Sequence, residues 1–164
     1  MNRWEERSSA RVTEPARPRK LAKVPFVELA DGRLQGVVSS GSDIERVYVS
    51  SIGARDHAYA CSTNNNRPCG GARGYMCNHL RALVDEAVLQ YGAPRVARYL
   101  RVEVDDPSAN SIMAELRGPA STDGTAVAAT VFSRFLRHLA YLELPATTAP
   151  LPEMQWFPPA GAVR

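Results

Sequence analysis

Short runs of hydrophobic and β-branched residues follow one another in the part of the chain that begins near residue 24. Runs of this length, bounded by Gly, Asp and Ser, are typical of β-strands. The Asp31-Gly32 pair lies between the first two runs and favours a tight hairpin turn. The pattern therefore predicts a small antiparallel meander with strands at about 24–29, 33–38, 44–51 and 57–62.

After residue 77 the hydrophobic positions follow the period of a helix. One face of a helix at 78–91 would carry Leu80, Leu83, Val84, Ala87 and Val88. Gly92 and Pro94 form a stop signal. Further helices are predicted at about 94–102, 107–117 and 125–144. The apolar residues of the last helix cover more than one face, which predicts a central core helix or one that packs against a partner.

These elements predict one α+β domain at residues 24–144, in which the meander precedes a helical C-terminal half. The 45% hydrophobic content is sufficient for a single core. Residues 1–23 are polar, charged and interrupted by prolines, so we expect a disordered basic tail. Residues 145–164 contain five of the twelve prolines and form a Pro-rich extension. Within it, Trp156 and Phe157 are candidate anchors for a protein partner, unless they cover the domain's own sheet.

Charge and composition limit the classes of partner. The net charge is +3, but residues 1–23 hold seven basic and three acidic residues, so this tail carries +4 and the remainder −1. No apolar run approaches the ~20 residues of a membrane span, and the start of the chain lacks the apolar centre of a secretory signal. The number of cysteines is odd and low, which is typical of a reducing compartment. We therefore expect a cytoplasmic protein with no membrane partner.

All three cysteines occur in one window that ends with a histidine. The set is Cys61, Cys69, Cys77 and His79, and turn-forming Asn, Pro and Gly residues fill much of the interval. Three thiolates and an imidazole form one of the closed tetrahedral ligand sets that structural zinc prefers. The alternatives are three buried free thiols and an iron–sulfur site.

The order of these residues resembles the SWIM-type zinc finger over about residues 44–90. The matching pieces are RVYVSS at 46–51, HAYACS at 57–62 and CNHLRALVDEA at 77–87, where Cys77 and His79 match the family's Cys-x-His. The family has Cys-x-Cys before its variable loop, whereas here Thr63 stands two residues after Cys61. Cys69 is therefore expected to replace the second ligand, with His57 as the alternative. The resemblance implies a zinc-held platform for protein or DNA partners, without catalysis.

Three functions remain as hypotheses: an adaptor that docks on a protein, a nucleic-acid-binding accessory protein and an enzyme. The nucleic-acid hypothesis depends on the basic tail and on candidate phosphate contacts at Arg67, Arg73, Arg81, Arg95 and Arg98. An enzyme is least expected, since the chain has neither His-Glu-x-x-His nor the His-x-Glu and Cys-x-x-Cys of a deaminase. The near-neutral body favours the adaptor, with no catalytic residue and no small-molecule substrate.

Overall fold

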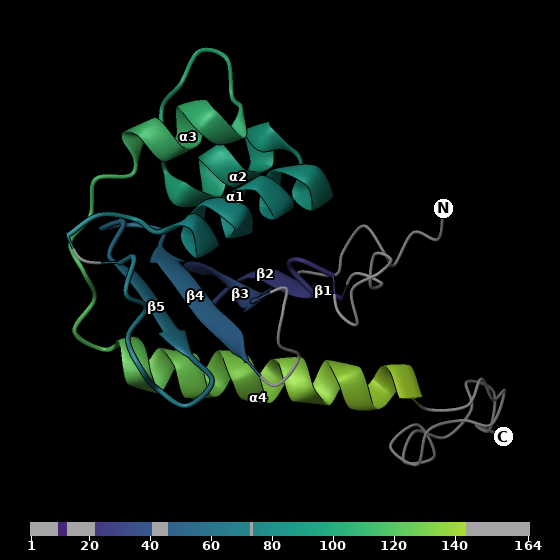
Figure 1. Cartoon of the computed structure of the whole chain (residues 1–164). Coiled ribbons are helices and arrows are strands. Elements are labelled where there is room, and N and C mark those ends of the chain that lie inside the picture. Colours follow the sequence, from purple (N-terminus) through teal and green to yellow (C-terminus); the bar gives the residue numbers. More distant parts are fainter. Residues whose placement is uncertain (1–9, 13–21, 41–45, 73, 144–164) are drawn as a thin grey trace, which may run out of the picture.

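A five-stranded antiparallel sheet, whose strand order follows the chain, forms the centre of the protein (Figure 1). The computed structural model describes residues 10–12, 22–40, 46–72 and 74–143. The strands are β1 (Ala10–Val12), β2 (Phe26–Ala30), β3 (Arg33–Ser39), β4 (Val47–Gly53) and β5 (Tyr59–Thr63). The helices are α1 (Asn78–Tyr91), α2 (Ala93–Leu100), α3 (Ala109–Glu115) and α4 (Gly124–Glu143). The predicted α+β class, with a meander followed by helices, is confirmed.

Strand β1 corrects one expectation. Residues 1–23 were predicted to be a disordered tail, yet Ala10–Val12 pair antiparallel with β2 at the edge of the sheet. A three-residue edge strand needs only backbone hydrogen bonds to its neighbour, so it requires no amphipathic pattern that a sequence could display. The other predicted strands occur where expected, with shifts of one to three residues at their ends.

The sheet separates two hydrophobic clusters. Helices α1, α2 and α3 lie on one face and α4 lies on the other (Figure 1). Side chains alternate between the faces along β4: Tyr48 and Ile52 pack with the α1 cluster, whereas Val47 and Val49 pack with α4. The cluster of Cys61, Cys69 and Cys77 belongs to the α1 face.

Helix α1 is the central helix and approaches the sheet closely. Leu80 and Leu83 are fully buried. A side chain at Gly36 of β3 would place its Cβ 2.8 Å from Leu83 Cδ1 and 2.2 Å from the Phe26 carbonyl oxygen, so glycine allows this approach. At the other end of the helix, the Tyr91 hydroxyl donates to the Val27 carbonyl oxygen at 3.1 Å. The N-cap of α1 is Cys77.

Of the two placements that its apolar pattern predicts, α4 does not take that of the central core helix, and packing against a partner stays a prediction. It packs Val131 and Phe135 against β2, β3 and β4, while Leu136 and Tyr141 are exposed. An ion pair links it to the sheet, since Arg134 contacts the buried Glu28 carboxylate at 2.9 Å and Asp31 at 2.7 Å. Leu136 and Tyr141 are thus large apolar side chains of α4 that the described residues leave exposed.

Two expectations concern parts of the chain that the structure does not describe. The Pro-rich extension at 145–164, with Trp156 and Phe157, lies outside the described residues. Residues 1–9 and 13–21 of the basic tail lie outside them as well. Within the described ranges, no helix has the length and apolar character needed to span a membrane.

Candidate metal centre

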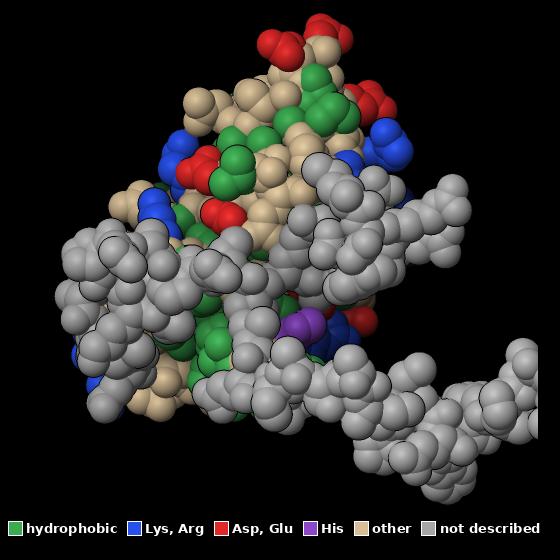
Figure 2. Space-filling model, turned by 90° about the vertical axis from the view of Figure 1, so that its right-hand side faces the viewer, with side chains coloured by type: hydrophobic (Ala, Val, Ile, Leu, Met, Phe, Trp, Pro, Cys, Tyr) green, Lys and Arg blue, Asp and Glu red, His purple; other side chains and the backbone are tan. Residues whose placement is uncertain are grey.

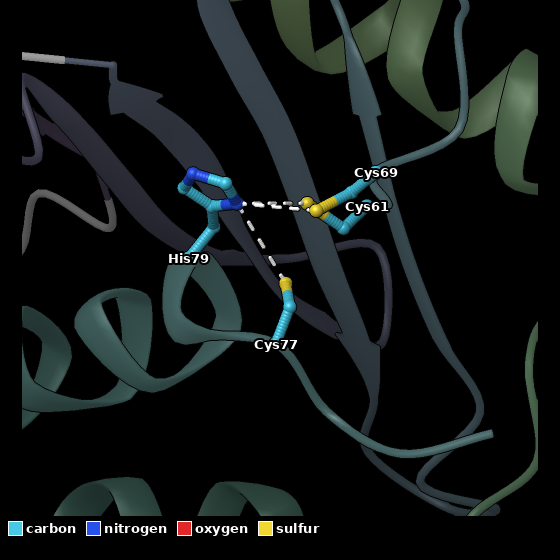
Figure 3. Close-up of side chains that lie close together, drawn as sticks. All are labelled: Cys61, Cys69, Cys77 and His79. Carbon is cyan, nitrogen blue, oxygen red and sulfur yellow. Dashed lines mark hydrogen bonds between the residues drawn. The ribbon is translucent and has the colours of Figure 1, made fainter. Parts of the chain in front are cut away.

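Four side chains from three separate segments converge between the sheet and the start of α1 (Figure 3). Cys61 lies on β5, where it is paired with Ser50 of β4. Cys69 lies in the loop after β5 and is held there by its backbone N–H, which donates to the Cys61 carbonyl oxygen at 3.0 Å. Cys77 is the N-cap of α1 and His79 lies in its first turn.

The spacing of the four ligand atoms fits a single ion. The Nδ1 atom of His79 lies 3.4 Å from Cys69 Sγ and 3.8 Å from the Sγ atoms of Cys61 and Cys77. All four ligand atoms lie within 4.8 Å of one another. A tetrahedral zinc ion with normal Zn–S and Zn–N bonds would place nitrogen and sulfur about 3.5 Å apart and two sulfurs about 3.8 Å apart. The cluster can therefore hold a metal ion without rearrangement of the backbone.

The loop between the cysteines is shaped by backbone conformations that its composition favours. Asn66 and Gly74 have left-handed φ angles of 58° and 86°, which Asn and Gly adopt most readily. At Gly71, a Cβ atom would lie 3.2 Å from the Cβ of Cys77 and 3.8 Å from Cys69 Sγ. The loop thus passes close to two candidate ligands at a point where a side chain would crowd them.

Two residues of β4 contact the candidate ligands from the sheet. The Ser50 hydroxyl is fully buried and donates to Cys61 Sγ at 3.4 Å. The Tyr48 ring stacks on the His79 imidazole, with ring centroids 3.7 Å apart and an interplanar angle of 16°. Such contacts orient metal ligands and adjust their basicity. Both residues were missed in the sequence, because strand alternation places 48 and 50 on one face but does not say which residue of β5 they oppose.

The surroundings shift the pKa of two of the three thiols. A hydrogen bond from the Cys61 thiol, aided by His79 and by the backbone at Leu80, lowers the pKa of Cys77 to about 3. The same hydrogen bond and burial raise the pKa of Cys61 far above its usual value. The two shifts have opposite directions, and a bound cation would favour the deprotonated form of all three thiols.

His57 does not belong to the cluster. Its Nε2 atom lies 2.8 Å from the Leu100 carbonyl oxygen, and its backbone adopts a left-handed φ of 54° in the turn before β5. Of the two candidates for the second ligand, the structure therefore brings Cys69 to the site. His138 packs its ring against Phe26, with centroids 5.3 Å apart, in agreement with a packing role.

The five candidate arginines do not form one surface among the described residues. Arg95 and Arg98 line a common cleft beside α2. Arg67 and Arg81 are exposed but do not line that cleft, and Arg73 lies outside the described residues. The periodicity of arginines along the sequence therefore grouped residues that the fold separates.

Neither protein-family models nor curated sequences nor solved structures match this chain. The likeness to a SWIM-type zinc finger consequently depends on the arrangement of residues alone. A strand that carries Cys61 is followed by a loop and by Cys77 and His79 at the start of a helix. In this arrangement the further thiol, Cys69, comes from within the loop.

Proposed function

We propose that the chain is a non-enzymatic, zinc-binding adaptor module of SWIM-like arrangement that docks on a protein partner. The observation that carries the proposal is the convergence of Cys61, Cys69, Cys77 and His79 at the junction of the sheet and α1. An ion at this position would join β5, the loop after it and the first turn of α1. Its contribution would be to fold and hold the platform.

The ligand set favours zinc in a structural role. Thiolates and imidazole together select Zn²⁺ over the hard cations that carboxylates bind. Four protein ligands would complete a tetrahedral shell, so no position would remain for a water or a substrate. The three sulfurs are also shielded, since their residues are between 5 and 8% exposed. A closed, buried site supports the non-enzymatic role.

The adaptor role is supported by the surface of α4. Leu136 is 49% exposed and Tyr141 is 63% exposed. Five residues apart on α4, they lie about 140° apart around the helix, on either side of the surface that packs on the sheet. Large apolar and aromatic side chains of this kind supply the anchors of protein interfaces. Helix α4 ends at Glu143, directly before the Pro-rich residues 145–164, so the helix face and the extension can together meet one partner.

Elemental analysis of the full chain, purified without added zinc, tests the metal. We expect about one zinc per chain in a colourless protein, because the closed Cys₃His set binds Zn²⁺ tightly at neutral pH. Less than half an equivalent of zinc would contradict a structural site. Stoichiometric iron with visible absorbance would instead identify an iron–sulfur centre.

Affinity capture from the source organism tests the adaptor role. The immobilised full chain is expected to retain a specific protein. The double variant Leu136→Glu, Tyr141→Glu is expected to retain at least about tenfold less of that protein, because interface anchors each contribute about 2 kcal/mol or more. Leu89→Glu is the matched control, because Leu89 is 78% exposed on α1 and not on α4. Equal retention by the double variant and the control would show that Leu136 and Tyr141 of α4 do not belong to the docking surface.

A further inference from the structure

A cleft of about 840 Å³ opens between helix α2 and the turns that follow β2 and β4. Its volume lies within the range of small-ligand sites. Its lining includes five arginines, from β3, the turn after β4, α2 and the end of α2: Arg33, Arg55, Arg95, Arg98 and Arg101. Tyr99 lies among them. We call this feature the arginine cleft.

The guanidinium groups of the arginine cleft are not neutralised by carboxylates. Across the part of the chain that the structure describes, the ion pairs join Arg134 to Glu28 and to Asp31, and none involves a cleft arginine. The two aspartates in the lining have other partners. Asp31 pairs with Arg134, and the Asp56 carboxylate accepts the Ala58 N–H at 3.0 Å. The cleft therefore concentrates positive charge in a body whose net charge is close to zero.

Two residues of the arginine cleft have a left-handed backbone, Asp31 in the hairpin turn that Asp-Gly favours and Arg101 at the end of α2. Arg101 ends α2 with a left-handed φ of 56°, a position at which glycine is usual. Asp31 has a φ of 51° in the turn opposite. Left-handed backbone at non-glycine residues costs about 1 kcal/mol or more and is often retained at functional sites. With arginine and not glycine at this position, the end of α2 adds a guanidinium group to the lining.

The positive region is bounded, which favours a compact ligand over an extended one. A second depression shares Arg98 and Arg101 with the cleft, but its lining continues with Glu103 and Asp105. Figure 2 shows acidic side chains at the upper end of the molecule, over the loop that joins α2 and α3. A nucleic-acid backbone that continued past Arg101 would meet these carboxylates, whereas a ligand contained in the cleft would not.

We propose that the arginine cleft binds a small ligand that carries two or more adjacent phosphate groups. Guanidinium groups bind phosphate oxygens through paired N–H donors, and several of them around one site suit a ligand of high charge density. Arg95 is additionally positioned by the Tyr91 ring, whose centroid lies 5.4 Å from the guanidinium carbon. The site is separate from the metal centre, and its occupation does not depend on the proposed adaptor role.

Isothermal titration calorimetry of the full chain with tripolyphosphate, and in parallel with ATP, tests this proposal. At about 50 mM salt, where screening is modest, we expect tripolyphosphate to bind with a Kd below about 1 mM. The double variant Arg95→Ala, Arg98→Ala is expected to bind at least tenfold more weakly. Both side chains are exposed, so the fold should be retained, as far-ultraviolet circular dichroism can verify.

A charge-matched control separates recognition from net charge. The double variant Arg46→Ala, Arg137→Ala also removes two exposed arginines, but neither of these lines the cleft, and we expect less than a twofold change. Tighter binding of ATP than of tripolyphosphate would identify a nucleotide, and equal binding would identify the phosphates alone as the recognised group. Three results would each overturn the proposal. The two double variants could lose equal affinity for tripolyphosphate, the full chain could fail to bind it at about 1 mM, or a single-stranded oligonucleotide could bind more tightly than tripolyphosphate through Arg95 and Arg98.

Discussion

Cys77→Ser and His79→Ala are each expected to abolish stoichiometric zinc binding and to remove most of the stability of the domain. Structural zinc in comparable ligand sets contributes about 10 kcal/mol or more of apparent free energy, whereas a whole domain is stable by only about 5–15 kcal/mol. The candidate ligands come from β5, its loop and α1, so these segments should lose their cooperative unfolding first. Thermal denaturation, metal content and amide hydrogen exchange measure the three consequences.

His57→Ala is the control for His79→Ala. Both variants remove one imidazole, but His57 Nε2 contacts the Leu100 carbonyl oxygen and not the cysteines. We expect the His57 variant to retain a full equivalent of zinc and to lose only about 1 kcal/mol, the net value of one hydrogen bond. Loss of zinc in the His57 variant together with its retention in the His79 variant would show that the ligand set is wrong.

The sheet and α1 could be predicted because each has a strong local pattern. Short hydrophobic and β-branched runs around the Asp31-Gly32 turn mark β2 to β4, and Leu80, Leu83 and Val84 mark one face of α1. For α4 the sequence left two placements open, a central core helix or one that packs against a partner, and only the first is excluded by the fold. The apolar residues of this helix cover more than one face, but hydrophobicity alone does not distinguish a face that packs on the sheet from one, such as that of Leu136, that remains exposed.

The candidate ligands could be listed from the sequence, but the choice between Cys69 and His57 could not. Both lie within a few residues of Cys61, and only the path of the chain decides between them. The backbone hydrogen bond from Cys69 to Cys61 returns the loop to β5, whereas the turn before β5 directs the His57 ring to the end of α2. Ser50 joins the site through strand register, which is also a long-range property.

The arginine cleft also could not be predicted, because it depends on residues that are far apart in the sequence. Arg95 and Arg98 are close in the sequence, and their spacing drew attention to α2. Arg33 and Arg55 join them only because two hairpin turns end beside that helix. A site whose residues come from the turns of different strands has no local sequence motif.

Arg134→Met is expected to lower the free energy of unfolding by about 3 kcal/mol, the cost of removing one partner from a buried ion pair. The Glu28 carboxylate is 5% exposed and would keep only the amide of Gln35, which donates to it at 2.7 Å. The hydrogen bond with Glu28 also raises the pKa of Arg134, so the guanidinium remains charged at any pH at which the domain is studied. The contact to Asp31 adds little, because that side chain is 45% exposed.

Urea denaturation of Arg134→Met beside Arg137→Met measures this effect. Arg137 is an exposed arginine three residues further along α4, and its loss should change stability by less than about 0.5 kcal/mol. The double variant Glu28→Gln, Arg134→Met should regain stability relative to Arg134→Met, because a neutral amide is less costly to bury than an unpaired carboxylate. If Arg134→Met matches Arg137→Met, the ion pair does not hold α4 on the sheet. If instead the double variant is the least stable, Glu28 contributes through its own hydrogen bonds and not through its charge, and α4 is held by its apolar contacts.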